Sequence, residues 1–329
     1  MRGLVVGYGS IGRRHARNWA ALGLGELRAS RNFPSLEAAL ADYAPEIVLV
    51  TNPTSLHIET ACLAVQAGAH VLVEKPISHT LEGVADLLAE SARHGRKLAV
   101  GYNLRFHPGL QRLRDIVQSG AIGKPLTARA EVGEYLPEWH PLEDYRKSYA
   151  ARRELGGGPV LTLSHDLDAL CWVLGRPRRI TALAAHTSSL QVDTEDAAEL
   201  VLQFENGALG SVHMDYVRRS ARRFLEVTGE QGIARWEYEP NRILLYAPGT
   251  REWRVEEGDP RFARNDMYIA ELDRFVRWVC GEAQGPLADG ASGAAVLAIA
   301  LTALRASEEG RTMDLHASDE PVRTWLNQL

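Results

Sequence analysis

The feature that most constrains the fold is a glycine-rich loop close to the start of the chain. The apolar residues 4–6 lead into Gly7, Gly9 and Gly12. This G-x-G-x-x-G spacing, at the end of a strand and the start of a helix, lets backbone N–H groups and the positive helix end approach a pyrophosphate. We therefore predict a dinucleotide site, whose cofactor-binding residues here are Gly7, Gly9, Ser10, Ile11 and Gly12.

The residues after the second short strand bear on which dinucleotide binds. An acid about 20 residues beyond the glycine loop commonly binds the ribose 2′-hydroxyl of NAD. This chain has Ser30 and Arg31 at that place, and Arg13 and Arg14 follow the loop. A hydroxyl and a guanidinium group suit a 2′-phosphate. We expect Ser30 and Arg31 to bind the cofactor, which is NAD or NADP, with NADP slightly favoured.

The order of apolar runs predicts the architecture. Short runs at residues 4–6, 47–51, 70–73 and 98–101 alternate with segments of helical period. That alternation is typical of a parallel sheet with right-handed crossovers. Beyond the turn at 119–125, strand signals dominate, including a hairpin around Asn206-Gly207.

We therefore predict an α/β protein of two domains. Residues 1–122 form an N-terminal Rossmann domain with a doubly wound parallel sheet that binds NAD(P). Residues 123–329 form a substrate-binding and oligomerisation α/β domain with an open, mostly antiparallel sheet. The uncovered face of that sheet predicts a homo-oligomer, a dimer or a tetramer.

Composition narrows the class of partner and compartment. The net charge of -5 gives no reason to expect nucleic acid, and a basic run at residues 218–223 comes with no recognised reading module. The 3 cysteines lack metal-ligand spacing, so we expect no metal and a reducing, cytoplasmic location. The N-terminus lacks the longer apolar region of a signal peptide. No uninterrupted apolar stretch reaches the roughly 20 residues of a membrane span, so we expect no membrane partner.

Several further motifs carry a resemblance to a known family. Thr51-Asn52-Pro53-Thr54-Ser55-Leu56-His57 and Val73-Glu74-Lys75-Pro76 each follow a buried strand. The chain also contains the segment 101–108, which begins Gly-Tyr-Asn-Leu-Arg, and three glycines at 156–158 before His165. Together with the glycine loop, these motifs resemble the glucose-fructose oxidoreductase/inositol dehydrogenase (Gfo/Idh/MocA) family. The resemblance covers most of the chain and implies an NAD(P)-dependent dehydrogenase or reductase acting on CH–OH groups.

The resemblance also implies roles for individual residues. Asn52, Pro53 and His57 would line the nicotinamide side of the cofactor, and Glu74-Lys75-Pro76 would present Lys75 to the reacting centre. Removing the proton of a hydroxyl group accompanies hydride loss, and a lysine near the oxygen can stabilise alkoxide character. We expect Glu74, Lys75 and Asn103 to contact the cofactor as well.

The second domain is expected to supply the acid/base group. His165 is the best candidate because imidazole titrates near neutrality, so the predicted catalytic residues are Lys75 and His165. The family usually has a carboxylate a few residues before this histidine, whereas this chain has Thr162. Thr162 can hydrogen-bond a sugar hydroxyl but cannot act as an anionic base. The expected substrate-binding residues are Lys75, Arg105, Tyr149, Thr162 and His165.

The predicted function is hydride transfer between NAD(P) and a secondary alcohol of a sugar, cyclitol or sugar acid. Aromatic, hydroxyl and cationic side chains at 134–153 suit such a polyol, including an amino sugar or a nucleotide sugar. Thr162 leaves open an alternative, a catalytically weak nucleotide-binding homologue that acts as a sensor or assembly partner. A non-sugar substrate is the third reading.

Overall fold

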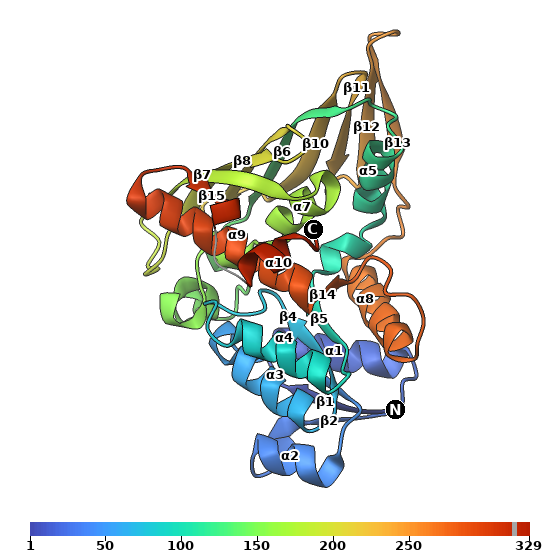
Figure 1. Ribbon diagram of the computed structural model, residues 1–329, viewed down its shortest axis with the longest axis vertical. Coiled ribbons are helices and arrows are strands. Elements are labelled where there is room, and N and C mark those ends of the chain that lie inside the picture. Colours follow the sequence, from blue (N-terminus) through green and yellow to red (C-terminus); the bar gives the residue numbers. More distant parts are fainter. Residues whose placement is uncertain (318–320) are drawn as a thin grey trace. The chain divides into compact units, whose positions relative to one another are not determined.

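The computed structural model describes residues 1–317 and 321–329. By its internal contacts the chain forms two compact units. Unit 1 comprises Met1–Phe106 and Ala263–Leu297, and unit 2 comprises His107–Phe262 and Ala298–Leu329. The elements of both are labelled in Figure 1.

Unit 1 is built on a six-stranded sheet in the order β14-β5-β4-β3-β1-β2. Five strands are mutually parallel, and the edge strand β14 (Ala288–Asp289) runs antiparallel to β5. The parallel strands are β1 (Arg2–Val6), β2 (Glu26–Ala29), β3 (Ile47–Val50), β4 (His70–Glu74) and β5 (Leu98–Gly101). The strand order reverses between β1 and β3, which makes the carboxyl ends of these strands the expected ligand site.

Helices cover this sheet because its central strands are apolar. All four residues of β3 are buried, and three of them, Ile47, Val48 and Val50, have β-branched side chains, which suit a strand covered on both faces. The helices of unit 1 are α1 (Ser10–Ala21), α2 (Leu36–Tyr43), α3 (His57–Gln66), α4 (Val84–Arg93) and α8 (Arg264–Val279). Helix α1 packs on α8, and α3 packs on α4 (Figure 1).

Unit 2 contains a nine-stranded sheet in the order β13-β12-β11-β10-β6-β9-β8-β7-β15. All neighbours are antiparallel except β6 and β9. The strands are β6 (Pro125–Gly133), β7 (Pro177–Ala185), β8 (Ala197–Phe204), β9 (Leu209–Asp215), β10 (Arg222–Gly229), β11 (Gly232–Glu237), β12 (Arg242–Ala247), β13 (Glu252–Glu257) and β15 (Met313–Asp314).

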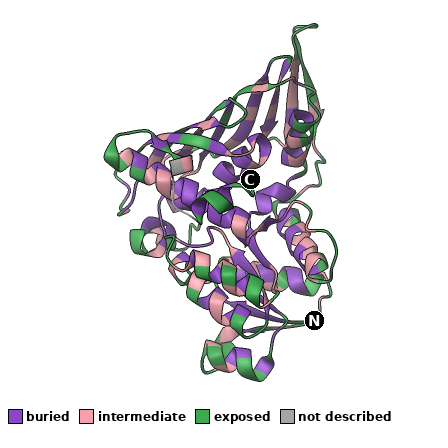
Figure 2. Cartoon of the chain, viewed as in Figure 1, coloured by how far each residue is buried: buried purple, intermediate pink, exposed green. Residues whose placement is uncertain are grey.

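One face of the unit 2 sheet is covered by helices. Helix α5 packs on β11 and β12, and α7 packs on β6 and β9. Along β8, buried residues alternate with exposed ones, as Figure 2 shows for the strands of this sheet. The helices of unit 2 are α5 (Pro108–Gln118), α6 (Pro159–Thr162), α7 (His165–Leu174) and α10 (Val322–Leu326), and α9 (Gly290–Glu309) contributes to both units.

The predicted α/β fold, a Rossmann-type parallel sheet followed by a mostly antiparallel sheet, is confirmed. The predicted hairpin is also present, since β8 and β9 pair antiparallel around Gly207, whose φ is 90°. The contact units differ from the expected domain boundary after residue 122. Helix α5 belongs with the sheet of unit 2, and α8 returns to unit 1 because it packs on α1. The domain assignment itself stays a prediction.

Helix α9 is long and apolar enough to cross a membrane by length and composition. In the described part of the chain, 67% of its most apolar window is buried inside the protein. A buried core helix meets the same criterion, so the length and composition of α9 are weak evidence for a membrane span.

Candidate active site

The glycine loop joins β1 to α1 and lies against the end of β3. A Cβ atom at Gly7, whose φ is 91°, would lie 2.4 Å from the backbone nitrogen of Asn52. A Cβ at Gly12 would lie 2.0 Å from the carbonyl oxygen of Gly7, whereas one at Gly9 would meet no atom within 4 Å. Gly7 and Gly12 are therefore required by internal packing, and Gly9 borders open space.

The first turn of α1 offers backbone donors to that space. Gly9 is the N-cap residue, no side chain caps the helix, and its first turn contains no acid. The hydroxyl group of Thr51 donates to the carbonyl oxygen of Val6 at 2.9 Å and also contacts that of Gly7. An uncapped 12-residue helix behind a fixed loop fits a pyrophosphate group.

Ser30 and Arg31, which we expect to bind the cofactor, follow directly after β2. Ser30, Arg31 and Asn32 form a 3-10 turn, η1 (Ser30–Asn32). The Arg31 guanidinium lies over the ring of Tyr8, 4.1 Å from its centroid. Arg13 donates to the carbonyl oxygen of Tyr8 at 3.3 Å. Arg14 instead lies over the ring of Tyr268 in α8, at 4.5 Å, so the two arginines after the loop have different partners.

His57 ties the loop after β3 to the loop after β4. Its ring is buried; Nδ1 lies 2.9 Å from the carbonyl oxygen of Pro76 and Nε2 lies 3.0 Å from that of Asn52. Burial lowers the pKa of His57, and the two carbonyl contacts oppose that shift. The contacts fix the loop positions of Asn52 and Pro76, which border Pro53 and Lys75.

Asn52 has one polar atom that suits a ligand. Its side-chain Nδ2 donates to the hydroxyl of Thr60 at 2.8 Å. Its Oδ1 atom is buried and has no hydrogen-bond partner among the described residues. An orphaned acceptor beside the glycine loop fits a donor group of a bound cofactor, such as a carboxamide.

The turn after β4 holds Lys75 between two anchored neighbours. Glu74 accepts a hydrogen bond from, or pairs with, Nε2 of the buried His15 at 2.8 Å. Burial acts to raise the pKa of Glu74, but the His15 contact and the nearby Lys75 charge outweigh it, so the pKa is lowered. Lys75 joins Pro76 through a cis peptide bond. The carboxylate of Glu74 thus serves to position the turn.

Strand register brings these groups to one edge of the unit 1 sheet. Val6 is paired with Val50, Val50 with Val73, and Glu74 with Gly101. The glycine loop, Asn52, Lys75 and Asn103 therefore follow adjacent strand ends. Asn103 and Arg105 lie in η3 (Asn103–Phe106), both buried.

In unit 2, Thr162 ends α6 and His165 begins α7. Thr162 is buried, and its hydroxyl group contacts the carbonyl oxygen of Gly158 and the hydroxyl of Tyr216. Burial raises the pKa of Tyr216 well above its ordinary value, which keeps this hydroxyl neutral. His165 is partly exposed. A neutral pair of hydroxyl groups therefore occupies the place of the usual carboxylate.

Charged residues around these helices are mostly paired. Asp166 pairs with Arg223 at 3.2 Å. Arg218 pairs with Glu131 at 2.7 Å. Tyr149 lies in η6 (Tyr149–Ala151) and is 36% exposed, so its ring is accessible.

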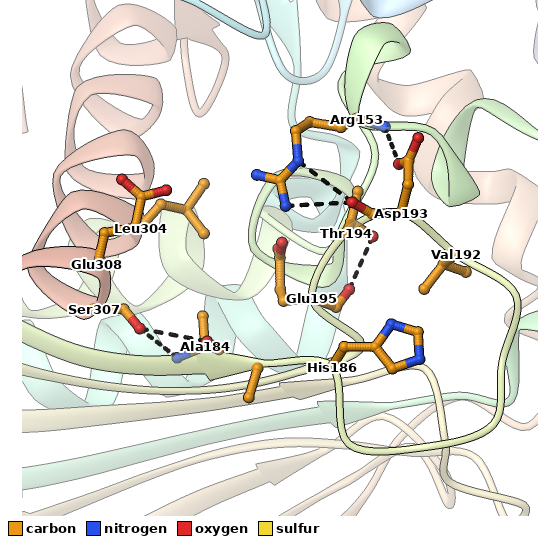
Figure 3. Close-up of a pocket in the computed structure, with 11 residues that line it drawn as sticks. Arg153, Ala184, His186, Val192, Asp193, Thr194, Glu195, Leu304, Ser307 and Glu308 are labelled. Carbon is orange, nitrogen blue, oxygen red and sulfur yellow. Dashed lines mark hydrogen bonds between the residues drawn. The ribbon is translucent and has the colours of Figure 1, made fainter.

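A cavity of about 360 Å³ lies within unit 2 (Figure 3). The Arg153 guanidinium group donates there to the carbonyl oxygen of Asp193 at 3.3 Å. Burial raises the pKa of Glu195, whose Oε1 atom accepts from the backbone N–H of Val160 at 3.3 Å. The lining contains no predicted catalytic or substrate-binding residue. The cavity is therefore separate from the predicted site residues of this unit.

Comparison with known proteins gives two family matches. Residues 25–102 match an oxidoreductase family described as having an NAD-binding Rossmann fold, and residues 110–235 match the GFO/IDH/MocA C-terminal domain. An inositol 2-dehydrogenase of Saccharopolyspora erythraea is 31% identical over 297 residues, covering 85% of this chain and 80% of the relative. The chain belongs to the GFO/IDH/MocA oxidoreductase family.

Other members of this family agree in length and fold. A 1,5-anhydro-D-fructose reductase of Ensifer adhaerens is 28% identical, covering 87% of this chain and 84% of the relative. The solved UDP-N-acetylglucosamine 3-dehydrogenase of Acidithiobacillus ferrooxidans is 27% identical with a TM-score of 0.76, covering 94% and 98%. A levoglucosan dehydrogenase in complex with NADH and L-sorbose has a TM-score of 0.84 at 19% identity, covering 95% and 98%, and shows the fold alone.

Family membership confirms the predicted resemblance and makes the chain an oxidoreductase that uses NAD or NADP. The structure adds three residues that sequence reasoning missed: Tyr8 under Arg31, His15 beside Glu74, and Tyr216 beside Thr162. His15 could have been noticed in the sequence only because its helical spacing from Gly12 and Trp19 places it on the buried face of α1. Tyr8 and Tyr216 act through contacts that no motif encodes.

Proposed function

We propose that this chain transfers hydride between NAD(P) and a secondary alcohol of a sugar, cyclitol or sugar acid. The anchored turn at Lys75 is the observation that carries the proposal. His15 contacts Glu74 on one side of Lys75, and His57 contacts Pro76 on the other. These contacts hold Lys75 at the end of β4, close to the glycine loop. A positioned cation next to a nucleotide site suits chemistry at a hydroxyl oxygen.

The proposed roles divide between the two units. When bound, NAD(P) supplies the hydride acceptor, and Asn52 and the glycine loop hold it. Lys75 donates a hydrogen bond to the substrate oxygen and stabilises its alkoxide character. His165 accepts the hydroxyl proton in oxidation and returns it in reduction.

The names of relatives support a polyhydroxylated substrate. This chain is similar to an inositol 2-dehydrogenase, a 1,5-anhydro-D-fructose reductase and a UDP-N-acetylglucosamine 3-dehydrogenase. These names share a ring that bears several hydroxyl groups. Arg105, Tyr149 and Thr162 remain our proposed substrate contacts, with the Thr162 hydroxyl held by Tyr216.

Replacing Lys75 tests the proposal. We expect Lys75→Ala to lower kcat by about 10²- to 10⁴-fold with little change in cofactor affinity, since a positioned proton-transfer group contributes on that scale. The matched control is Lys97→Ala. Lys97 immediately precedes β5, so it lies at the amino end of the strands, opposite to Lys75, and its ammonium group lies over the ring of Trp278. Oxidation of a sugar and cyclitol panel is followed by the absorbance of the reduced cofactor. Equal turnover in the wild type and Lys75→Ala would reject the role of Lys75.

The alternative function makes a different prediction in the same assay. A nucleotide-binding homologue that acts as a sensor or assembly partner would bind NAD(P) and oxidise no member of the panel. Steady production of NADH or NADPH by the wild type eliminates it.

We also propose a homodimer or homotetramer formed through the open face of the unit 2 sheet. Leu183, Val201 and Leu209 on adjacent strands are 75%, 46% and 51% exposed. Val201→Lys is expected to reduce the molar mass in sedimentation velocity, whereas Leu142→Lys, at a fully exposed residue off the sheet, is not. For the location we propose the cytoplasm, in keeping with three cysteines that form no disulfide bond.

A further inference from the structure

The side chain between the first two glycines of the loop lies beneath Arg31. Ala29 of β2 pairs with Val5 of β1, so Ser30 and Arg31 leave the sheet at the same edge as the glycine loop. The Arg31 guanidinium group is 4.1 Å from the centroid of the Tyr8 ring. A guanidinium group over an aromatic face at this distance is held by a cation–π interaction.

The donors of Arg31 are not engaged elsewhere. Arg31 is exposed, and within the described part of the chain its guanidinium group has no hydrogen bond or ion pair. Arg28, three residues earlier, differs: it donates to Glu26 at 2.6 Å while lying over Tyr43 at 4.7 Å. Both arginines therefore stack on a tyrosine, but Arg28 is also paired with a carboxylate, whereas Arg31 has no such acid beside it in the described part of the chain.

Tyr8 is itself fixed. Its carbonyl oxygen accepts a hydrogen bond from Arg13 at 3.3 Å, and it follows Gly7, which is packed against Asn52. The backbone that carries the Tyr8 ring is therefore held in place beneath Arg31. A guanidinium group already held in place loses less conformational freedom when it binds an anion.

We infer that Tyr8 and Arg31 act together to make this chain selective for NADP over NAD. The inference rests on the proposed function, because it concerns the cofactor of that site. Ser30 stands where an acid would bind the 2′-hydroxyl of NAD and repel a phosphate. Arg31 offers several N–H donors to the oxygens of a 2′-phosphate, and Tyr8 is the positioning residue that holds it.

Cofactor binding tests the inference without turnover. NADPH and NADH are titrated into the full chain, and the fluorescence of the reduced nicotinamide gives each Kd. Five variants are compared with the wild type: Arg31→Ala, Tyr8→Leu, Tyr8→Phe, the double variant Arg31→Ala/Tyr8→Leu, and the control Arg28→Ala. Circular dichroism checks that each is folded.

The expected losses differ by residue. Arg31→Ala weakens NADPH binding by about 10- to 100-fold, the scale of charge-assisted hydrogen bonds, and leaves NADH binding nearly unchanged. Tyr8→Leu weakens NADPH binding by about two- to five-fold, as expected for an exposed cation–π pair. Tyr8→Phe binds like the wild type, because the ring and not the hydroxyl group lies beneath Arg31. The double variant is no weaker than Arg31→Ala, and Arg28→Ala changes neither Kd.

Other outcomes overturn the inference. A wild type that binds NADH as tightly as NADPH rejects the selectivity, and losses for Tyr8→Leu that are equal for both cofactors reject the positioning role of Tyr8. Additive losses in the double variant would show that Tyr8 acts independently of Arg31. Failure of the wild type to bind either cofactor is separate, since it contradicts the proposed function itself.

Discussion

The carboxyl edge of the unit 1 sheet and the α6–α7 segment of unit 2 are organised in different ways. At the sheet edge, adjacent parallel strands are followed by Gly7, Asn52, Lys75 and Asn103, so strand order brings these groups together, and the His15–Glu74 contact supports the turn at Lys75. In the α6–α7 segment, the environment of Thr162 depends on Tyr216, 54 residues away. The backbone positions at the sheet edge thus follow from the strand ends, whereas the side-chain contacts of Thr162 depend on a residue distant in the sequence.

This difference separates the features that a family shares from those that distinguish its members. A pyrophosphate needs backbone donors and a close approach, which glycines supply whatever the substrate. The residues around the acid/base group are not constrained in this way. Here a threonine and a buried neutral tyrosine stand in place of the usual carboxylate, and His165 is the proposed acid/base group of that segment.

The largest effect that tests the comparison is expected at His165. His165→Gln should lower kcat by about 10²- to 10⁴-fold and leave the Kd for the cofactor unchanged, because the role proposed for His165 is proton transfer. His186→Gln is the control, since His186 is an exposed histidine of the same unit. A comparable loss of cofactor binding in His165→Gln would contradict a role of His165 that is confined to proton transfer.

Alanine substitutions in the glycine loop come next. Gly12→Ala places a Cβ atom 2.0 Å from the Gly7 carbonyl oxygen, and we expect about 1–3 kcal/mol of destabilisation as for other overpacked sites. Gly9→Ala, which meets no atom within 4 Å, should unfold like the wild type in urea but bind the cofactor more weakly. Equal unfolding free energies for the two variants would contradict the division of roles in the loop.

Removing the Tyr216 hydroxyl group has a smaller expected effect. Tyr216→Phe removes the hydroxyl group that contacts Thr162, whereas Thr162 keeps its contact with the Gly158 carbonyl oxygen, so we expect a loss of about 0.5–1.5 kcal/mol of unfolding free energy. Cofactor affinity should not change. Tyr246→Phe in β12 is a suitable control, because that ring is only partly buried beside Trp253. A Tyr216→Phe variant as stable as the wild type would show that the hydroxyl pair contributes nothing to unit 2.

The smallest effect concerns pH. The hydrogen bond to Asp215, with help from Glu199, raises the pKa of His213 although burial opposes it. Because the folded pKa lies above the unfolded value of about 6.5, its stabilisation is complete below that pH and is lost as pH rises through the folded pKa. We expect less than about 1 kcal/mol, as for a partly exposed ion pair. The melting temperature of His213→Gln should therefore change less than that of the wild type as the pH rises above about 6.5. If the melting temperatures of both proteins changed equally with pH, the pH dependence of stability would belong to other groups.

Much of the fold could be predicted from the sequence, because strand runs and glycine turns are local signals. The glycine loop, the β8–β9 hairpin and the parallel strands of the first sheet follow from them. Helix α8 could not be assigned to unit 1, since nothing in its own sequence shows that it packs on α1. The contact of His15 with Glu74 joins residues 59 apart, and no periodicity encodes such a pair.

Deuterium transfer tests the central claim most directly. A sugar or cyclitol that the wild type oxidises is prepared with deuterium on the carbon of its secondary alcohol and incubated with the oxidised cofactor. Hydride transfer from the alcohol carbon predicts that the reduced nicotinamide carries that deuterium, detected by mass spectrometry, and that Lys75→Ala forms the deuterated cofactor far more slowly. A reduced cofactor without deuterium would contradict hydride transfer from the alcohol carbon.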